Sequence, residues 1–164
     1  MPFVAIAMFV AIAICHSSVL PNDGIPGFGF ATVATQGTYG IIIDERFAGP
    51  FVYMPEGQTF ETWTPSREDV STAETLLRPL RPGDALNAEA RQDYDSPGEA
   101  VSRTWYGAIV EGERLLFVNG YCSGGIPSNP LTPVIVADGG ACFWNATIDA
   151  DTWEIVSYVE NGVA

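Results

Sequence analysis

The second half of the chain holds a succession of strand-like segments, and this pattern limits the fold more than any other feature. Residues 102–110 (SRTWYGAIV) and 114–122 (RLLFVNGYC) are rich in aromatic and β-branched side chains, and residues 111–113 between them have the length and composition of a hairpin turn. Residues 141–149 and 153–160 repeat the arrangement across another short turn. The pattern predicts a sheet of four antiparallel strands.

One main helix is predicted before these strands. Thr64 followed by Pro65 is typical of a helix start, and Pro79, Pro82 and Gly83 end the helical pattern. The apolar positions recur at helical spacing and predict a buried face of Val70, Ala73, Leu76, Leu77 and Leu80. A helix packed on an antiparallel sheet of four or more strands gives an α+β fold of the helix-grip kind, cystatin-like or NTF2-like, which by itself carries no function.

Other segments extend this architecture. Residues 38–44 (TYGIIID) and 51–54 (FVYM) are short β-rich runs separated by a Gly-Pro pair, and they predict a first hairpin or an edge pair. Residues 133–137 (PVIVA) are also strand-like, whereas the polar, acidic residues 84–98 predict a surface loop.

An apolar run at residues 3–15 (FVAIAMFVAIAIC) predicts export. The run has the length of a secretion-signal core and is shorter than the ~20 residues needed to cross a bilayer. We expect residues 1–18 to form a signal peptide cleaved after Ser17, or an N-terminal membrane anchor. Acylation of Cys15 is a further alternative, although Ile14 stands where a small residue is usual.

The rest of the chain predicts one domain. Residues 19–30 are rich in glycine and proline and predict a linker. Residues 31–164 then form a single α+β domain, because a chain of 164 residues holds one hydrophobic core more readily than two.

The cysteine count predicts a disulfide bond. With Cys15 removed or acylated, Cys122 and Cys142 are the remaining thiols, and such a pair in an oxidising compartment usually bonds. Closing a loop of about 20 residues stabilises a fold by roughly 3 kcal/mol through the restricted unfolded chain. The competing interpretation, a catalytic thiol, lacks a base because His16 is the only histidine.

Charge and composition exclude several function classes. Twenty acidic residues against seven arginines and no lysine give a net charge of −13, which repels nucleic acid and anionic lipid. The missing lysine excludes Schiff-base chemistry, and the position of His16 leaves the domain no imidazole for a catalytic triad or a zinc site. We therefore expect no cofactor, no metal and no catalytic residue, and membrane contact only through residues 1–20.

Some local patterns resemble sites but have simpler structural interpretations. Asp149 and Asp151 offer the alternating carboxylates of a calcium loop without its later glycine and glutamate, so a turn is favoured. Residues 138–140 (DGG) also fit a turn. Residues 145–147 (NAT) match a glycosylation acceptor, which matters only in a eukaryotic secretory pathway.

Paired carboxylates and aromatic side chains are the other candidates. Glu111 with Glu113, or Asp93 with Asp95, could supply an acid and a base, but as loop residues they are expected to be solvated. The aromatic side chains along the strands are expected to pack the sheet: Trp105, Tyr106, Tyr121, Trp144 and Trp153.

Four segments together resemble a group of uncharacterised exported bacterial proteins: WTP at residues 63–65, NGYC at 119–122, DGGACF at 138–143 and NGVA at 161–164. The resemblance implies a bacterial origin and the cysteine pair, and it raises the lipoprotein alternative. It brings no activity, so no functional residue is transferred.

We expect a non-enzymatic binding or structural protein of the bacterial envelope, periplasmic or extracellular, that recognises a protein or a small ligand through its sheet face or loops. The missing lysine, domain histidine and free thiol motivate this expectation. The alternatives are an accessory subunit held on a membrane complex by residues 3–20, a carboxylate-dependent extracellular hydrolase and a cystatin-like protease inhibitor.

Overall fold

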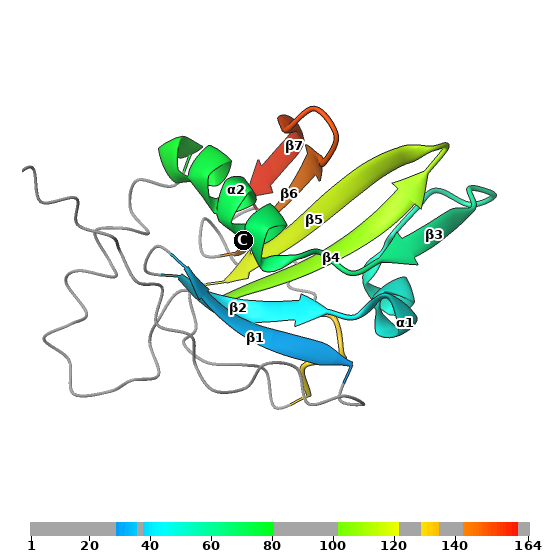
Figure 1. Cartoon of the computed structure of the whole chain (residues 1–164). Helices are drawn as coiled ribbons and strands as arrows, with labels where there is room; N and C mark the ends of the chain where they lie inside the picture. The colour runs from blue at the N-terminus through cyan, green and yellow to red at the C-terminus, as the bar shows by residue number, and fades with distance from the viewer. Residues whose placement is uncertain (1–28, 36–37, 81–101, 122–128, 135–142, 161–164) are drawn as a thin grey trace, which may run out of the picture.

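The computed structural model of the protein describes residues 29–35, 38–80, 102–121, 129–134 and 143–160 (Figure 1). These residues form an α+β fold with a mixed, mostly antiparallel sheet, which confirms the predicted fold class. In the described part of the chain the sheet has seven strands: β1 (Phe30–Thr35), β2 (Thr38–Ile43), β3 (Phe60–Trp63), β4 (Ser102–Val110), β5 (Glu113–Tyr121), β6 (Phe143–Asp149) and β7 (Glu154–Glu160). The helical elements are α1 (Glu45–Ala48), α2 (Arg67–Leu77) and the 3₁₀ helices η1 (Gly49–Phe51) and η2 (Arg78–Leu80). None of the described helices is long and apolar enough to cross a membrane.

Strand β4 organises the sheet because both of its edges are paired. The strand order is β1-β2-β4-β5-β6-β7, and β3 also pairs with β4. On one edge, β2 runs parallel to residues 102–105 of β4, and β3 runs antiparallel to residues 107–110. On the other edge, β5 pairs with the whole of β4. The hairpins β4-β5 and β6-β7 agree with the sequence prediction.

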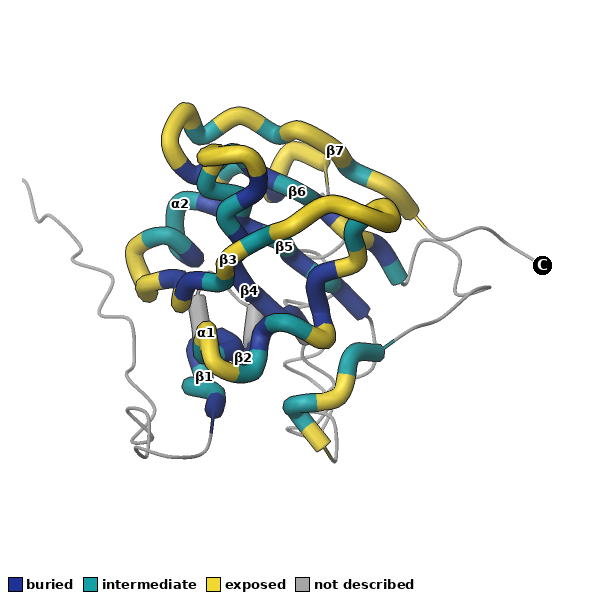
Figure 2. Tube along the Cα trace, turned by 90° about the vertical axis from the view of Figure 1, so that its right-hand side faces the viewer, coloured by how far each residue is buried: buried dark blue, intermediate teal, exposed yellow. Residues whose placement is uncertain are grey.

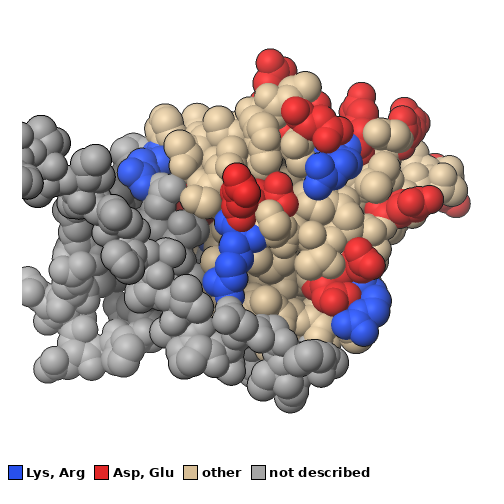
Figure 3. Space-filling model, viewed as in Figure 1, with Lys and Arg blue, Asp and Glu red and all other residues tan. Residues whose placement is uncertain are grey.

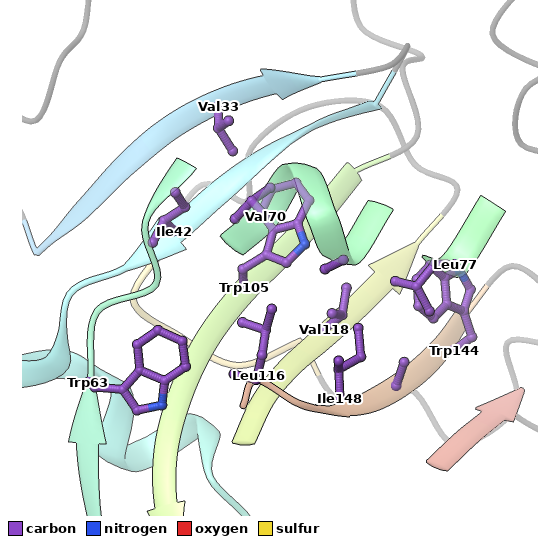
Figure 4. Close-up of a cluster of buried hydrophobic side chains, with 13 residues drawn as sticks. Val33, Ile42, Trp63, Val70, Leu77, Trp105, Leu116, Val118, Trp144 and Ile148 are labelled. Carbon is purple, nitrogen blue, oxygen red and sulfur yellow. The ribbon is translucent and has the colours of Figure 1, made fainter. Parts of the chain in front are cut away.

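The sheet is covered on both faces. On the first face, α2 lies across the strands and packs Val70 and Leu77 into a core with Trp105 and Trp144 (Figure 1, Figure 4). On the second face, α1 and η1 pack against Tyr106 and its neighbours. Successive side chains of a strand point to opposite faces, so β4 contributes Trp105 to one core and Tyr106 to the other. Figure 2 shows that β4 is mostly buried and that β5 alternates between buried and intermediate residues, whereas β7 is mostly exposed.

Helix α2 begins later than the Thr64-Pro65 pattern predicts, because Ser66 is its N-cap. The Ser66 hydroxyl accepts a hydrogen bond from the Asp69 backbone N–H (3.1 Å), and the Asp69 carboxylate accepts one from the Ser66 N–H (2.7 Å). This reciprocal cap satisfies two backbone donors at the helix start. Thr64 instead accepts a hydrogen bond from the Glu45 N–H (2.9 Å), which ties the start of α1 to the segment before α2.

Two further predictions are corrected by the structure. Residues 51–54 form no strand, because Phe51 and Val52 are adjacent and yet both are buried in the second core, which the alternation of a strand does not allow. The predicted pairing with residues 38–44 is therefore wrong, and β2 pairs with β1 and β4. Leu80, expected on the buried helix face, is 43% exposed because the α-helix has already given way to η2.

Strands β1 and β3 are additions to the predicted sheet. Strand β1 starts at Phe30, the last residue of the segment expected to be a linker. Strand β3 has only four residues, too few for a clear alternating pattern. Pro133 and Val134, the described part of the predicted strand at 133–137, belong to no strand, and the predicted loop at 84–98 lies outside the described residues.

Two tryptophan rings lie against glycines of the neighbouring strand. Trp144 is the direct register partner of Gly120, and Trp63 is the direct partner of Gly107. A Cβ atom added to either glycine would overlap the indole ring opposite it. Each ring thus covers a stretch of backbone that has no side chain of its own, and glycine is the only residue that leaves room for it.

A buried ion pair joins α2 to β4 on the first face. The Arg103 Nε lies 3.3 Å from a Glu74 carboxylate oxygen, and only 1% of Arg103 and 5% of Glu74 are exposed. The Arg103 guanidinium also lies 4.5 Å from the ring centroid of Trp144. Charges this far from water persist only when they are paired, so the ion pair fixes how the helix sits on the strand.

Replacing Gly120 with alanine is expected to lower the free energy of unfolding by about 1–3 kcal/mol, because the new methyl group displaces the Trp144 ring. Urea denaturation measures the change. Ser157→Ala is the control, since it places the same methyl side chain at an exposed position of the sheet, on β7. Its unfolding free energy is expected to change by less than about 0.5 kcal/mol, and equal losses in the two variants would contradict the steric account.

Replacing Arg103 with methionine is expected to cost about 3–5 kcal/mol of stability, because it leaves the Glu74 carboxylate buried without its arginine. The double variant Arg103→Met/Glu74→Leu removes both charges and is expected to recover most of that loss. Urea denaturation of both proteins tests the pair. A double variant no more stable than the single one would show that the charge of Glu74 is not the cause.

Candidate functional site

The candidate site is a groove on the second face of the sheet. Helix α1 and η1 cover the part of this face formed by β2, β3 and β4, and the groove of about 540 Å³ lies beside them, over β5 and β6. Its described lining residues come from η1 and the segment after it, from three strands and from the segment before β6: Pro50, Phe51, Val52, Tyr53, Tyr106, Phe117, Asn119, Pro133, Val134, Phe143, Asn145 and Thr147.

Three aromatic rings form one wall of the groove. Tyr106 and Phe117 are direct register partners on β4 and β5, and their rings stack nearly parallel with centroids 5.4 Å apart. Phe51 packs against Tyr106 at the same centroid distance with its ring tilted by 44°. Because the strand register and η1 both hold these rings, the wall exists before any ligand arrives.

The polar lining comes from β5 and β6. Asn119 and Asn145 are direct register partners, and Thr147 lies opposite Phe117. The Asn119 side-chain amide donates a hydrogen bond to the Val134 carbonyl (3.2 Å), which ties Val134 to β5, and Pro133 and Val134 both line the groove. Asn145 is exposed, so it lies where a ligand would meet water.

Tyr106 is the polar lining residue that is most withdrawn from water. Only 8% of it is exposed, and this burial raises the pKa of its phenol to about 12. The phenol therefore keeps its proton at neutral pH and can donate a hydrogen bond.

The groove is uncharged although the chain is strongly acidic. None of the described residues that line the groove carries a charge, whereas the whole chain has a net charge of −13. On the face seen in Figure 3, the carboxylates of the described residues gather toward the end of the sheet that holds the β4-β5 and β6-β7 turns. The described lining favours a neutral ligand, because none of these residues would form an ion pair with a charged one.

The sequence-predicted acidic pairs do not meet in this groove. The Asp149 carboxylate accepts hydrogen bonds from the backbone N–H groups of Thr152 (3.0 Å) and Asp151 (2.8 Å), which lower the pKa of Asp149. Asp151 lies 3.5 Å from Arg114. These bonds account for both aspartates as turn residues, and the described residues contain no cluster of metal-ligating side chains.

Glu111 and Glu113 separate at the hairpin turn between β4 and β5. Glu111 adopts a positive φ of 53° in the turn, and Glu113 is already the first residue of β5. Glu111 and Glu61 line a second, more open depression of about 510 Å³, in which both side chains are exposed. Asp93 and Asp95 lie outside the described residues.

The remaining predicted residues divide between packing, the groove and undescribed segments. Trp105, Trp144 and Trp153 pack in or against the first core, as expected for sheet packing. Asn145 of the glycosylation pattern lies within β6, not in the surface loop where such acceptors are usual. Cys15, His16, Cys122, Cys142 and residues 138–140 lie outside the described residues.

Sequence reasoning missed the groove because it assigned Tyr106 to packing alone. One signal was available in Asn119, a polar side chain that follows the apolar run at residues 115–118 (LLFV). A comparison of the chain with protein family models, with curated proteins and with solved structures finds no significant match in any of the three. The functional argument therefore rests on the geometry of the site.

Proposed function

We propose that the protein is an exported, non-enzymatic binding protein of the bacterial envelope that takes a small neutral ligand in the groove on the second face of its sheet. The observation that carries the proposal is the groove itself, with a volume of about 540 Å³. This volume lies within the usual range for small-molecule sites. Its lining of aromatic and apolar side chains with a few polar groups is also typical of such sites.

The finer fold assignment belongs to the same proposal. The position of α2 across the first face supports a helix-grip arrangement, cystatin-like or NTF2-like. The parallel pairing of β2 with β4 and the second layer formed by α1 extend that arrangement. This likeness supports a scaffold for binding and says nothing about the ligand.

The strand register supports the proposed Cys122–Cys142 disulfide. Tyr121 and Phe143 are direct partners at the ends of β5 and β6, and the two cysteines are the next residues outward in the sequence. Directly opposed positions of antiparallel strands have Cα separations of about 4.5–5.5 Å, which lie within the span of a disulfide. The pairing in turn supports an oxidising compartment outside the cytoplasm.

The hydrolase alternative is less well supported. It requires an acid and a base that face one cleft. The depression lined by Glu61 and Glu111 supplies two carboxylates. Both side chains are exposed to bulk water, whereas catalytic carboxylates usually work in sites that exclude it. The accessory-subunit alternative depends on residues 3–20, outside the described part of the chain.

Filling the groove is expected to abolish binding. The neutral dye N-phenyl-1-naphthylamine should bind the wild-type protein with a saturable rise in fluorescence, and Thr147→Trp should weaken this binding by at least roughly tenfold. Thr75→Trp places the same side chain at an exposed position of α2, on the other side of the sheet, and should leave binding unchanged. Urea denaturation checks that both variants are folded. A wild-type protein that does not bind the dye, or equal binding by all three proteins, would refute the groove as the site.

Protein isolated from its native envelope without reductant is expected to yield a peptide that joins Cys122 to Cys142, with a mature N-terminus that begins after Ser17. Peptide mass spectrometry after alkylation measures both properties. A reduced sample is the control, in which both thiols become alkylated. Alkylation of both cysteines in the unreduced sample would overturn the disulfide, and an N-terminus at Met1 would favour the anchor.

A further inference from the structure

Among the described residues of the groove, the Tyr106 hydroxyl is the group that points to a particular ligand chemistry. Tyr106 lines the groove and is more than nine-tenths buried, and no described residue forms a hydrogen bond with its hydroxyl. The ring of Tyr106 is buried, but its hydroxyl oxygen is not among the fully buried polar atoms of the described residues, so it reaches the water of the groove. A ligand oxygen that replaces this water can accept the hydrogen bond of the hydroxyl.

We propose that the groove selects neutral aromatic ligands that carry a hydrogen-bond acceptor, such as a ketone oxygen, and that this oxygen accepts a hydrogen bond from the Tyr106 hydroxyl. This inference rests on the proposed function, because it names the ligand class of the same groove. The aromatic body of the ligand would lie against Phe117 and Phe143, which line the groove on β5 and β6.

The direction of this hydrogen bond follows from the protonation of the phenol. At neutral pH the Tyr106 hydroxyl carries its proton, so it offers a donor that a carbonyl or ether oxygen can use. The other polar groups of the lining are less suited to this role. Asn119 already donates to Val134, and Asn145 is exposed to water. Tyr53 is almost fully exposed, and Thr147 is less buried than Tyr106.

The charge distribution separates this ligand class from ionic ones. An anion would meet a chain of net charge −13 and a lining that offers no described cation. A quaternary ammonium ion would be drawn to that charge, but it needs open aromatic faces. Phe117 stacks on the Tyr106 ring and Phe51 packs against it, so the Tyr106 ring has no open face to offer. A cation would be left with the half-buried rings of Phe117 and Phe143.

A matched pair of ligands tests the proposal. 2-Acetylnaphthalene and 2-ethylnaphthalene differ in a carbonyl oxygen, and competition against N-phenyl-1-naphthylamine gives a dissociation constant for each. The Tyr106→Phe variant removes only the hydroxyl. The preference for the ketone over the hydrocarbon is expected to fall by roughly five- to tenfold in this variant, with the hydrocarbon affinity nearly unchanged.

The outcomes distinguish the two proposals. If neither naphthalene competes and the dye itself does not bind, the groove is not a ligand site and the proposed function fails. If both compete but Tyr106→Phe leaves their ratio unchanged, the groove stands and the Tyr106 hydrogen bond is refuted. Phenyltrimethylammonium competing more strongly than the ketone would replace the proposed ligand class by a cation.

A second measurement does not depend on the variant. The infrared carbonyl stretch of ¹³C-labelled 2-acetylnaphthalene bound to wild-type protein is expected to lie at the lower frequency typical of a hydrogen-bonded ketone. Thr75→Trp is the control protein and should give the same band, because residue 75 lies on α2 across the sheet. A bound carbonyl band at the frequency found in a hydrocarbon solvent would overturn the proposal even if Tyr106→Phe failed to fold.

Discussion

The alternation of side chains along β4 is the constraint on which the rest of the structure depends. Because β4 is paired on both edges and covered on both faces, each of its residues has one direction in which to pack. Arg103 and Trp105 meet α2, whereas Tyr106 meets η1 and the groove. A shift of one residue in register would send the arginine to the groove side and the tyrosine beneath the helix. The ion pair and the groove are therefore positioned by the same strand.

Glycines set the positions of the large rings on this framework. Gly107 and Gly120 each lie opposite a tryptophan, and Gly40 leaves room for Trp105 beside the backbone of β4. A glycine weakens a strand because it has no side chain to pack, yet here each one lets an indole lie close to the sheet. The first core thus combines three tryptophans with ten smaller aliphatic side chains (Figure 4), and the strand register sets where the indole rings lie.

This division explains what could be predicted from the sequence. The hairpins β4-β5 and β6-β7 are local, so composition and turn residues were sufficient to predict both. The parallel pairing of β2 with β4 joins residues far apart in the chain, and no local pattern encodes it. Phe51 was predicted to lie in a strand because it is apolar, but it packs from η1 into the second core. Tyr106 was assigned to packing alone, because its place in the groove depends on how far α1 and η1 extend over the sheet.

Among the described residues, the helical layers on the two faces of the sheet differ in length, and the groove lies beside the shorter layer. Helix α2 has eleven residues, whereas α1 and η1 together supply seven, from Glu45 to Phe51. The shorter layer covers β2, β3 and β4 and leaves Phe117 and Phe143 to line the groove beyond it. Uncovered apolar surface costs free energy in water, and a ligand that buries it stabilises the folded state in proportion to the logarithm of its concentration. The short helical layer of α1 and η1 therefore leaves the second core incomplete, and the same short layer leaves room for the proposed ligand.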